Sequence, residues 1–203
     1  MDWEAFFPIF EKIKNEIKEV LPYHCIEVEH AEADDIIATI VKMFYKTGEE
    51  ICIVSSDNDM IQLQKYGTNI VQWSPRIKKF LNYENTQYNL MEHIVGGDAN
   101  DGIPNIWSDD DTCVTEKRMK TFSSKRKEIV TSHNFQISDL AINKNEVDKF
   151  KRNAILIDLD KIPDDIVKDI KEAVYNNKPP KGKLFNYLIQ NQCMKLLDSA
   201  NDF

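Results

Sequence analysis

The sequence predicts an α/β fold in which a partial parallel sheet with helices is followed by a helical domain. Two observations support this prediction. Short apolar runs alternate with helical patterns up to about residue 82, in the order strand, helix, strand, short helix, strand. Beyond that point the pattern is mostly helical. The 203 residues allow one large domain or two small ones, so we expect two parts, residues 1–82 and 83–203.

The elements of the first part follow from the spacing of apolar residues. Residues 5–20 have apolar side chains at helical spacing, and Pro22 ends this predicted helix. Residues 32–46 repeat the helical pattern with acids in the first turn. The apolar run at 51–55 is typical of an inner strand of a parallel sheet. Further strands are expected at 24–28 and 69–73, with a short helix beginning near Asn58.

The second part is expected to be helical around one tight loop. The loop GGDANDGIPN spans residues 96–105, and its glycines and proline predict a backbone-rich turn. The helices are expected at residues 87–95, 125–132, 147–156, 164–175 and 184–198.

Composition excludes several classes of protein. The net charge of −8 argues against a protein that simply coats nucleic acid, although Lys117–Lys127 is a local run of six cations without an acid. The four cysteines and four histidines are scattered, so a zinc-type site is not expected. No apolar run approaches the roughly 20 residues that a membrane helix needs. The acidic N-terminus does not resemble a secretory signal, and we expect a cytosolic protein without membrane partners.

Three short acidic clusters are the strongest functional signal. Each has a purely structural alternative: acids at a helix N-terminus, a capped turn after a strand, and a plain loop, respectively. If the clusters converge, their mutual repulsion requires cations, because two like charges about 4 Å apart repel by roughly 4 kcal/mol at an effective dielectric of 20. The clusters are Glu32, Asp34 and Asp35; Asp57 and Asp59; and Asp98 and Asp101.

Oxygen ligands without clustered His or Cys favour Mg²⁺, with Mn²⁺ as the other candidate. Two such ions roughly 3.5–4 Å apart would form a two-metal site for cleaving phosphodiesters. The alternative of a phosphohydrolase or glycosyltransferase using Asp-x-Asp is disfavoured. Met60 follows Asp59 where a haloacid-type motif has Thr or Val, and the Gly-Asp loop would be left unexplained.

At these motifs the chain resembles the 5′-nuclease (flap endonuclease) family, and within it the RNase H group of T-even bacteriophages. EADD at 32–35, SSDNDMIQL at 55–63 and GGDANDGIP at 96–104 are similar to the three acidic motifs of the family, in the same order. Three further segments are similar to the phage group in particular: QWSPRIKKF at 72–80, LIDLDKIPDDI at 156–166 and PPKGKLFNYL at 179–188.

The resemblance implies a PIN-like sheet, a helix–two-turns–helix DNA-binding element and a two-ion magnesium site. It implies catalytic roles for Glu32, Asp35, Asp57, Asp59 and Asp98, and metal ligation by these five together with Asp34 and Asp101. Candidate phosphate contacts are Lys78, Lys79, Lys117, Arg118, Lys120, Lys125, Arg126 and Lys127, although the basic run could equally be a solvated helix face.

The implied activity is removal of RNA primers and of DNA 5′ ends or flaps during phage replication. The implied partners are RNA·DNA and DNA duplexes, a single-stranded-DNA-binding protein and a sliding clamp, in the cytoplasm of an infected bacterial host. The family pattern begins with two Asp-bearing strands and a basic arch, none of which precedes Met1 here. Three interpretations stay open: a nuclease half completed by a separate N-terminal polypeptide, a chain start placed too late, or a non-catalytic duplex-binding remnant.

Overall fold

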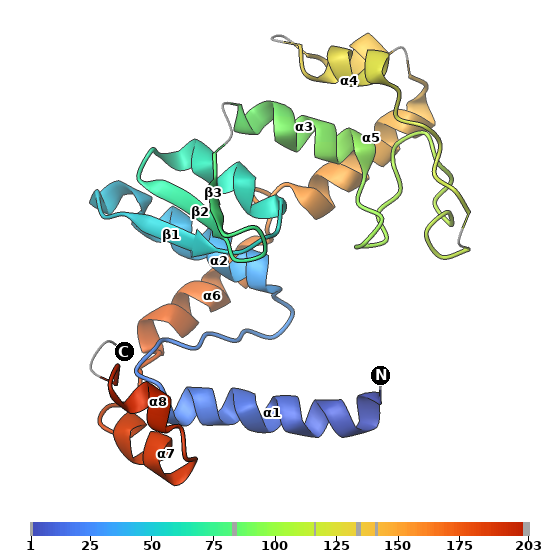
Figure 1. The fold of residues 1–203 in the computed structure, drawn as a ribbon. Helices are drawn as coiled ribbons and strands as arrows, with labels where there is room; N and C mark the ends of the chain where they lie inside the picture. Colours follow the sequence, from blue (N-terminus) through green and yellow to red (C-terminus); the bar gives the residue numbers. More distant parts are fainter. Residues whose placement is uncertain (1, 83–84, 116, 133–134, 141, 201–203) are drawn as a thin grey trace. The chain divides into compact units, whose positions relative to one another are not determined.

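The computed structural model describes residues 2–82, 85–115, 117–132, 135–140 and 142–200 (Figure 1). The chain divides into two compact units. The central unit spans Glu32–Val167, and the terminal unit combines Met1–Ala31 with Lys168–Phe203. Among the described residues, no helix is both long and apolar enough to cross a membrane.

The central unit is built on a small mixed sheet. Its strands are β1 (Ile51–Val54), β2 (Ile70–Ser74) and β3 (Lys79–Leu81), in the order β1-β2-β3. β1 and β2 are parallel, with Ile51 opposite Ile70, and β3 returns antiparallel to β2. The carboxyl ends of β1 and β2 therefore meet at one edge of the sheet, where acidic residues follow β1.

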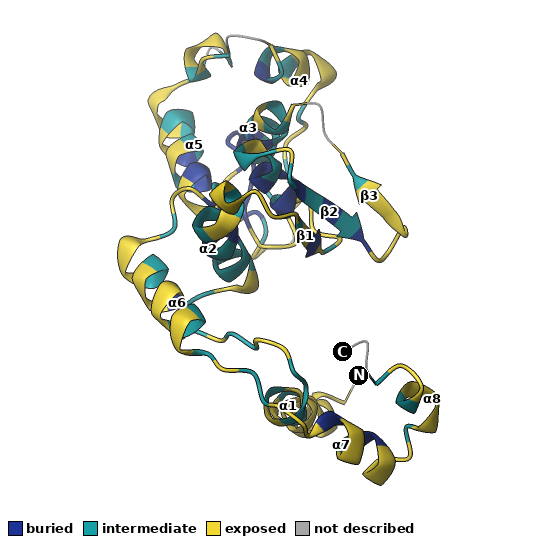
Figure 2. Cartoon of the chain, turned by 90° about the vertical axis from the view of Figure 1, so that its left-hand side faces the viewer, coloured by how far each residue is buried: buried dark blue, intermediate teal, exposed yellow. Residues whose placement is uncertain are grey.

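Two helical segments cover this sheet and enclose its core. They are α2 (Ala33–Phe44), extended by the short 3-10 turn η1 (Tyr45–Thr47), and the 3-10 helix η2 (Asp59–Tyr66). Their apolar faces meet the sheet in one buried cluster, drawn dark blue in Figure 2. The cluster consists of Ala38, Val41, Ile53, Met60, Leu63, Ile70 and Leu159.

The rest of the central unit is helical. It contains α3 (Thr86–Gly96), α4 (Ser124–Val130), η3 (Ile137–Leu140) and α5 (Lys144–Ile157). Leu90 and Ile94 of α3 pack against Ala154 and Ile157 of α5. The buried side chain of Asn153 reinforces this contact, because its Nδ2 donates to the carbonyl oxygens of Ile94 at 2.9 Å and Pro104 at 3.0 Å.

The terminal unit contains α1 (Trp3–Val20), most of α6 (Asp164–Asn176), α7 (Leu184–Gln190) and α8 (Met194–Leu197). The Tyr187 hydroxyl of α7 donates to Glu16 of α1 at 2.6 Å. No residue of α1 is buried. Its large apolar side chains lie exposed along the helix, among them Trp3, Phe6, Phe7, Phe10 and Ile13.

The structure confirms the α/β class and the parallel pair β1–β2, and it corrects two predicted elements. The strand expected at residues 24–28 is wrong: this segment is irregular, and the carbonyl oxygen of Cys25 accepts from the side chain of Asn177 at 3.0 Å instead of from a strand. The helix expected at 184–198 breaks into α7 and α8, with Gln192 in the left-handed region at φ 56°.

The sheet also contains β3, a strand that was not predicted. β3 is short and largely exposed, so it has no hydrophobic pattern that would indicate a strand. The sheet is therefore mixed and not wholly parallel. The central unit continues across position 82. The division of the chain into a nuclease part and a DNA-binding part at that position stays a prediction.

Candidate metal and phosphate site

The first acidic cluster lies at the start of α2. The backbone N–H of Glu32 donates to Asp35 Oδ2 at 3.0 Å, so the carboxylate of Asp35 caps the helix. Burial raises the pKa of Asp34, and the neighbouring charges of Glu32, Asp57 and Asp59 raise it further. The first two clusters are therefore close enough to influence one another.

The second cluster follows β1. A buried glutamine on β2 fixes the loop: Gln72 Nε2 donates to the carbonyl oxygens of Ser55 at 3.0 Å and Asp57 at 2.7 Å. Asp57 Oδ1 accepts from the backbone N–H of Asp59 at 3.0 Å, which forms a tight turn before η2. The N-cap of η2 is Asn58, so Asp57 is not the helix cap of the structural alternative. The turn uses one oxygen of Asp57.

The third cluster lies in the loop after α3. Gly97 has φ 68°, and a Cβ atom there would lie 2.4 Å from the carbonyl oxygen of Ile103, so only glycine allows the loop to close this tightly. Asp98 Oδ1 accepts the backbone N–H of Asn100 at 2.7 Å. Burial alone would raise the pKa of Asp98, but hydrogen bonds from that N–H and from a histidine lower it below its usual value.

The histidine is His93, in the last turn of α3, and sequence reasoning missed it. Its Nδ1 lies 2.8 Å from Asp59 Oδ1, and its Nε2 lies 3.1 Å from Asp98 Oδ2. The contact of Nε2 with Asp98 is a hydrogen bond, whereas Asp59 Oδ1 lies buried at ion-pair distance from Nδ1 without a hydrogen-bond partner among the described residues. The neighbouring carboxylate of Asp59 raises the pKa of His93 to about 8, against the opposing effect of burial.

The three clusters converge on one acidic region. Burial raises the pKa of Asp101, and the charges of Asp98, Asp59 and Asp57 raise it further. In the described part of the chain, however, no three His, Cys, Asp or Glu side chains are arranged to hold a metal ion. The donors are hard oxygens of the kind that Mg²⁺ and Mn²⁺ prefer, so the residues fit such ions chemically, but coordination requires side chains to reorient.

A cavity of about 610 Å³ opens beside these carboxylates. Asp57, Asp98 and His93 line it together with two cations, Arg76 from the β2–β3 turn and Lys127 from α4. Sequence reasoning missed Arg76, although it lies in the QWSPRIKKF segment. Carboxylates that can bind cations and basic side chains that can bind a phosphate therefore line the same cavity.

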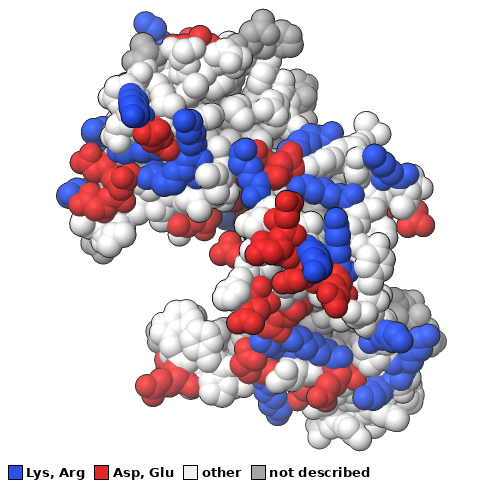
Figure 3. Space-filling view, turned by 180° about the vertical axis from the view of Figure 1, so that it is seen from behind, with Lys and Arg blue, Asp and Glu red and all other residues white. Residues whose placement is uncertain are grey.

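The predicted basic run is less available than its sequence suggests. Lys117 pairs with Asp111 at 2.8 Å, and Lys127 pairs with Glu92 at 2.5 Å. The Arg126 guanidinium stacks 4.1 Å from the centre of the Trp107 ring. In the view of Figure 3, Lys and Arg side chains are interspersed with Asp and Glu instead of forming an area of one sign.

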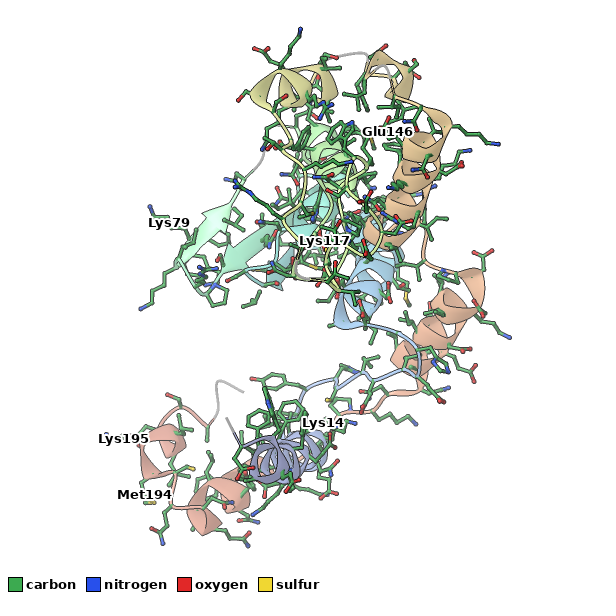
Figure 4. All side chains as sticks on the ribbon, turned by 90° about the vertical axis from the view of Figure 1, so that its right-hand side faces the viewer. Lys14, Lys79, Lys117, Glu146, Met194 and Lys195 are labelled. Atoms are coloured by element: carbon green, nitrogen blue, oxygen red, sulfur yellow. The ribbon has the colours of Figure 1, made fainter. Side chains whose placement is uncertain are left out.

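The other candidate cations are exposed. Lys79 projects outward from β3 (Figure 4), and Lys78 precedes it in the left-handed region at φ 53°. Arg118, Lys120 and Lys125 are exposed between the Gly-Asp loop and α4 or within α4 itself. These side chains could reach a phosphate backbone without first breaking an ion pair within the cavity.

Comparison with known proteins identifies the class to which this fold and site belong. The family described as the C-terminal part of T4 RNase H matches residues 85–203, and the N-terminal resolvase-like domain of 5′-3′ exonucleases matches residues 4–93. The chain therefore belongs to the 5′-3′ exonuclease and flap endonuclease family.

Individual relatives agree. Ribonuclease H of Enterobacteria phage T4 is 33% identical over 207 residues, covering 100% of this chain, which spans 68% of the length of that relative. A 5′-3′ exonuclease of Buchnera aphidicola is 31% identical over 129 residues, covering 51% of this chain and 40% of its own length.

Among solved structures, the T5 D15 protein co-crystallised with metal ions matches with a TM-score of 0.62 at 18% identity, over 85% of this chain and 70% of that one. A T5 D15 flap endonuclease in a pseudo-enzyme-product complex with DNA and metal ions matches with a TM-score of 0.53 at 19% identity, over 73% of this chain and 60% of that one. At these identities the likeness extends to the fold alone.

Proposed function

We propose that this chain carries most of the active site of a Mg²⁺-dependent 5′→3′ exonuclease and flap endonuclease of the RNase H type. Its substrates would be RNA primers and DNA 5′ ends or flaps in phage replication, in the cytoplasm of an infected bacterial cell. The observation that supports this most directly is the cavity in which Asp57 and Asp98 face Arg76 and Lys127.

We assign different roles to the carboxylates according to the contacts that they make in the structure. Glu32, Asp34, Asp57, Asp59, Asp98 and Asp101 would hold two Mg²⁺ or Mn²⁺ ions, while Asp35 caps α2 and acts on the site by positioning Glu32. When bound, such ions lower the pKa of an attacking water and stabilise the leaving oxygen. Burial raises the pKa values of Asp34 and Asp101, and the neighbouring carboxylates that raise them further support this assignment.

Binding of the duplex would use the cations around the cavity. Arg76 and Lys127 line the cavity itself, so they would contact the phosphate nearest the cleavage point, Lys127 after leaving its ion pair with Glu92. Lys78, Lys79 and the cations from Lys117 to Arg126 would contact phosphates further along the duplex, with the helical region after α3 acting as the helix–two-turns–helix element. Each neutralised phosphate adds to the salt dependence of binding.

A polypeptide that supplies the N-terminal elements of the family would complete the site. The apolar face of α1, on which Trp3, Phe6 and Phe10 are exposed, supports such a partner. A single-stranded-DNA-binding protein and a sliding clamp are further partners that membership of the family suggests.

The test is cleavage of a 5′-labelled flapped duplex with Mg²⁺, by the chain alone and with a polypeptide carrying the N-terminal strands and arch of a family member. We expect 5′ products that depend on Mg²⁺ and disappear in Asp57→Ala. Asp148→Ala is the matched control, because Asp148 lies exposed on α5 with only a 4.0 Å contact to Lys151. Activity that survives Asp57→Ala would refute the site assignment.

A second candidate is a duplex-binding remnant without catalysis. The absence of three suitably arranged ligands among the described residues, and the bridge from His93 to Asp59 and Asp98, favour it. This candidate predicts salt-sensitive binding of the same flapped duplex, with no cleavage under any combination of ion and added polypeptide.

A further inference from the structure

The imidazole ring of His93 occupies the space between two carboxylates that would otherwise share a cation. Asp59 Oδ1 lies 2.8 Å from one ring nitrogen and Asp98 Oδ2 lies 3.1 Å from the other. The two nitrogens face opposite sides of the ring, so they cannot both bind one ion. The ring therefore separates the two carboxylates.

This arrangement is built into the fold. His93 is in the last turn of α3, whose end is fixed from one side by the tight loop at Gly97 and from the other by Asn153. Asp59 is the first residue of η2, and its side chain is 12% exposed. The His93 side chain is itself only 19% exposed, and one side of it lines the open cavity. The ring therefore has space into which it can turn without unfolding α3.

We propose that His93 is a positioning residue that holds Asp59 and Asp98 in place of a divalent cation and must be displaced before these carboxylates bind the ion. This inference rests on the proposed function, because it concerns the same metal site. A divalent cation competes for the same two oxygens that the His93 ring contacts, so these contacts lower the affinity of the site for metal ions. Loading of the ion is then coupled to a movement of the His93 side chain into the cavity.

The competition also accounts for the lack of a ready metal-binding group among the described residues. Asp59 and Asp98 come from segments 39 positions apart and are brought to the two sides of one ring, not to a common point. Without the ring, their like charges would face each other across a gap that a divalent ion can fill. His93 thus sets how readily the site fills without itself belonging to the set of oxygen ligands.

The experiment is calorimetric titration of the 203-residue chain with Mn²⁺, comparing wild type with His93→Gln and His93→Ala. We expect both variants to bind Mn²⁺ about tenfold more tightly, equivalent to about 1.4 kcal/mol. His24→Gln is the matched control and should leave the affinity unchanged, since His24 is exposed and bonded to Asn177. Circular dichroism checks each fold, and the Gln variant serves where the Ala variant fails to fold.

Weaker Mn²⁺ binding by His93→Gln would identify His93 as a ligand and overturn the proposal, and an unchanged affinity would also overturn it. A second readout is the imidazole NMR signal of His93, which should shift on saturation with Mg²⁺ while that of His24 does not. A His93 signal unaffected at saturation would again overturn the proposal. If neither wild type nor the variants bind Mn²⁺, and Asp57→Asn gives the same titration as wild type, both the metal site of the proposed function and this inference are refuted.

Discussion

Asn153 offers a sharp test of how the Gly-Asp loop is held against the helices. Its side chain is fully buried, and its Nδ2 donates to the carbonyl oxygens of Ile94 and Pro104. Asn153→Ala removes these two bonds, and it also removes the Oδ1 acceptor of Arg152 Nε at 3.0 Å and Arg152 Nη2 at 2.8 Å. The carbonyl oxygen of Ile94 then loses its side-chain donor, while that of Pro104 keeps a weaker one in Arg152 Nη2 at 3.3 Å. At about 1–3 kcal/mol for a buried unpaired group, plus a small cavity, we expect a loss of about 3 kcal/mol.

Urea unfolding monitored by circular dichroism measures this loss as a lower midpoint at an unchanged slope. Asn153→Asp separates the donor from the cavity, because it keeps the shape and the acceptor of Arg152 but turns an acceptor toward two carbonyl oxygens. It should still destabilise the fold at pH 7, because both carbonyl oxygens lose the donor Nδ2. Asn191→Ala is the control, since this exposed side chain donates only to Tyr187 within α7 and should cost under about 0.5 kcal/mol. An Asp variant as stable as wild type would refute the assigned donors.

Three further predictions concern the site. His93 has a pKa of about 8 in the folded chain, above the 6.5 of an unperturbed histidine. The contribution of protonated His93 to the free energy of unfolding is therefore complete below pH 6.5 and is lost as the pH rises through 8. The free energy of unfolding in urea should be about 2 kcal/mol lower at pH 9 than at pH 6. If the stability of His93→Gln fell as steeply with pH as that of wild type, this prediction would be contradicted. Gly97→Ala should cost at least about 2 kcal/mol, because its Cβ would overlap a carbonyl oxygen, whereas Gly102→Ala, with a similar φ of 73° and open space, should cost only about 1 kcal/mol in thermal unfolding. Arg76→Ala and Lys127→Ala should each lower the salt slope of flapped-duplex binding by about 1 in fluorescence anisotropy, and unchanged slopes would place the phosphates elsewhere.

The sequence predicted the parallel pair of strands better than the rest of the sheet. The apolar runs identified β1 and β2, but β1 lies at the edge of the described sheet with Cys52 and Val54 exposed, so the expectation of an inner strand there was wrong. Residues 24–28 have a similar composition, but a strand also needs a partner, and this segment bonds to Asn177 instead. β3 is the opposite case, because its pairing with β2 comes from the preceding turn, while its own side chains are mostly exposed.

In the site, motif spacing identified the acids but not the groups that control them. The three clusters could be found because each follows a strand end, a helix start or a glycine loop. His93 and Arg76 carry no comparable signal, since their roles arise from where α3 and the β2–β3 turn end in space. The basic run was overestimated because two of its lysines are ion-paired. Lys127 pairs with Glu92, 35 residues away in the sequence, and Lys117 pairs with Asp111 of the nearby acidic run.

These features together indicate an acidic site that is only partly neutralised. His93 lies against Asp59 and Asp98, and hydrogen bonds from the backbone N–H of Asn100 and from His93 lower the pKa of Asp98. Burial and the neighbouring carboxylates raise the pKa values of Asp34 and Asp101, and the charge of His93 offsets this only in part at Asp101. A single internal cation therefore does not compensate the whole cluster. Under the proposed function, Asp34 and Asp101 are the carboxylates that a bound divalent ion would neutralise.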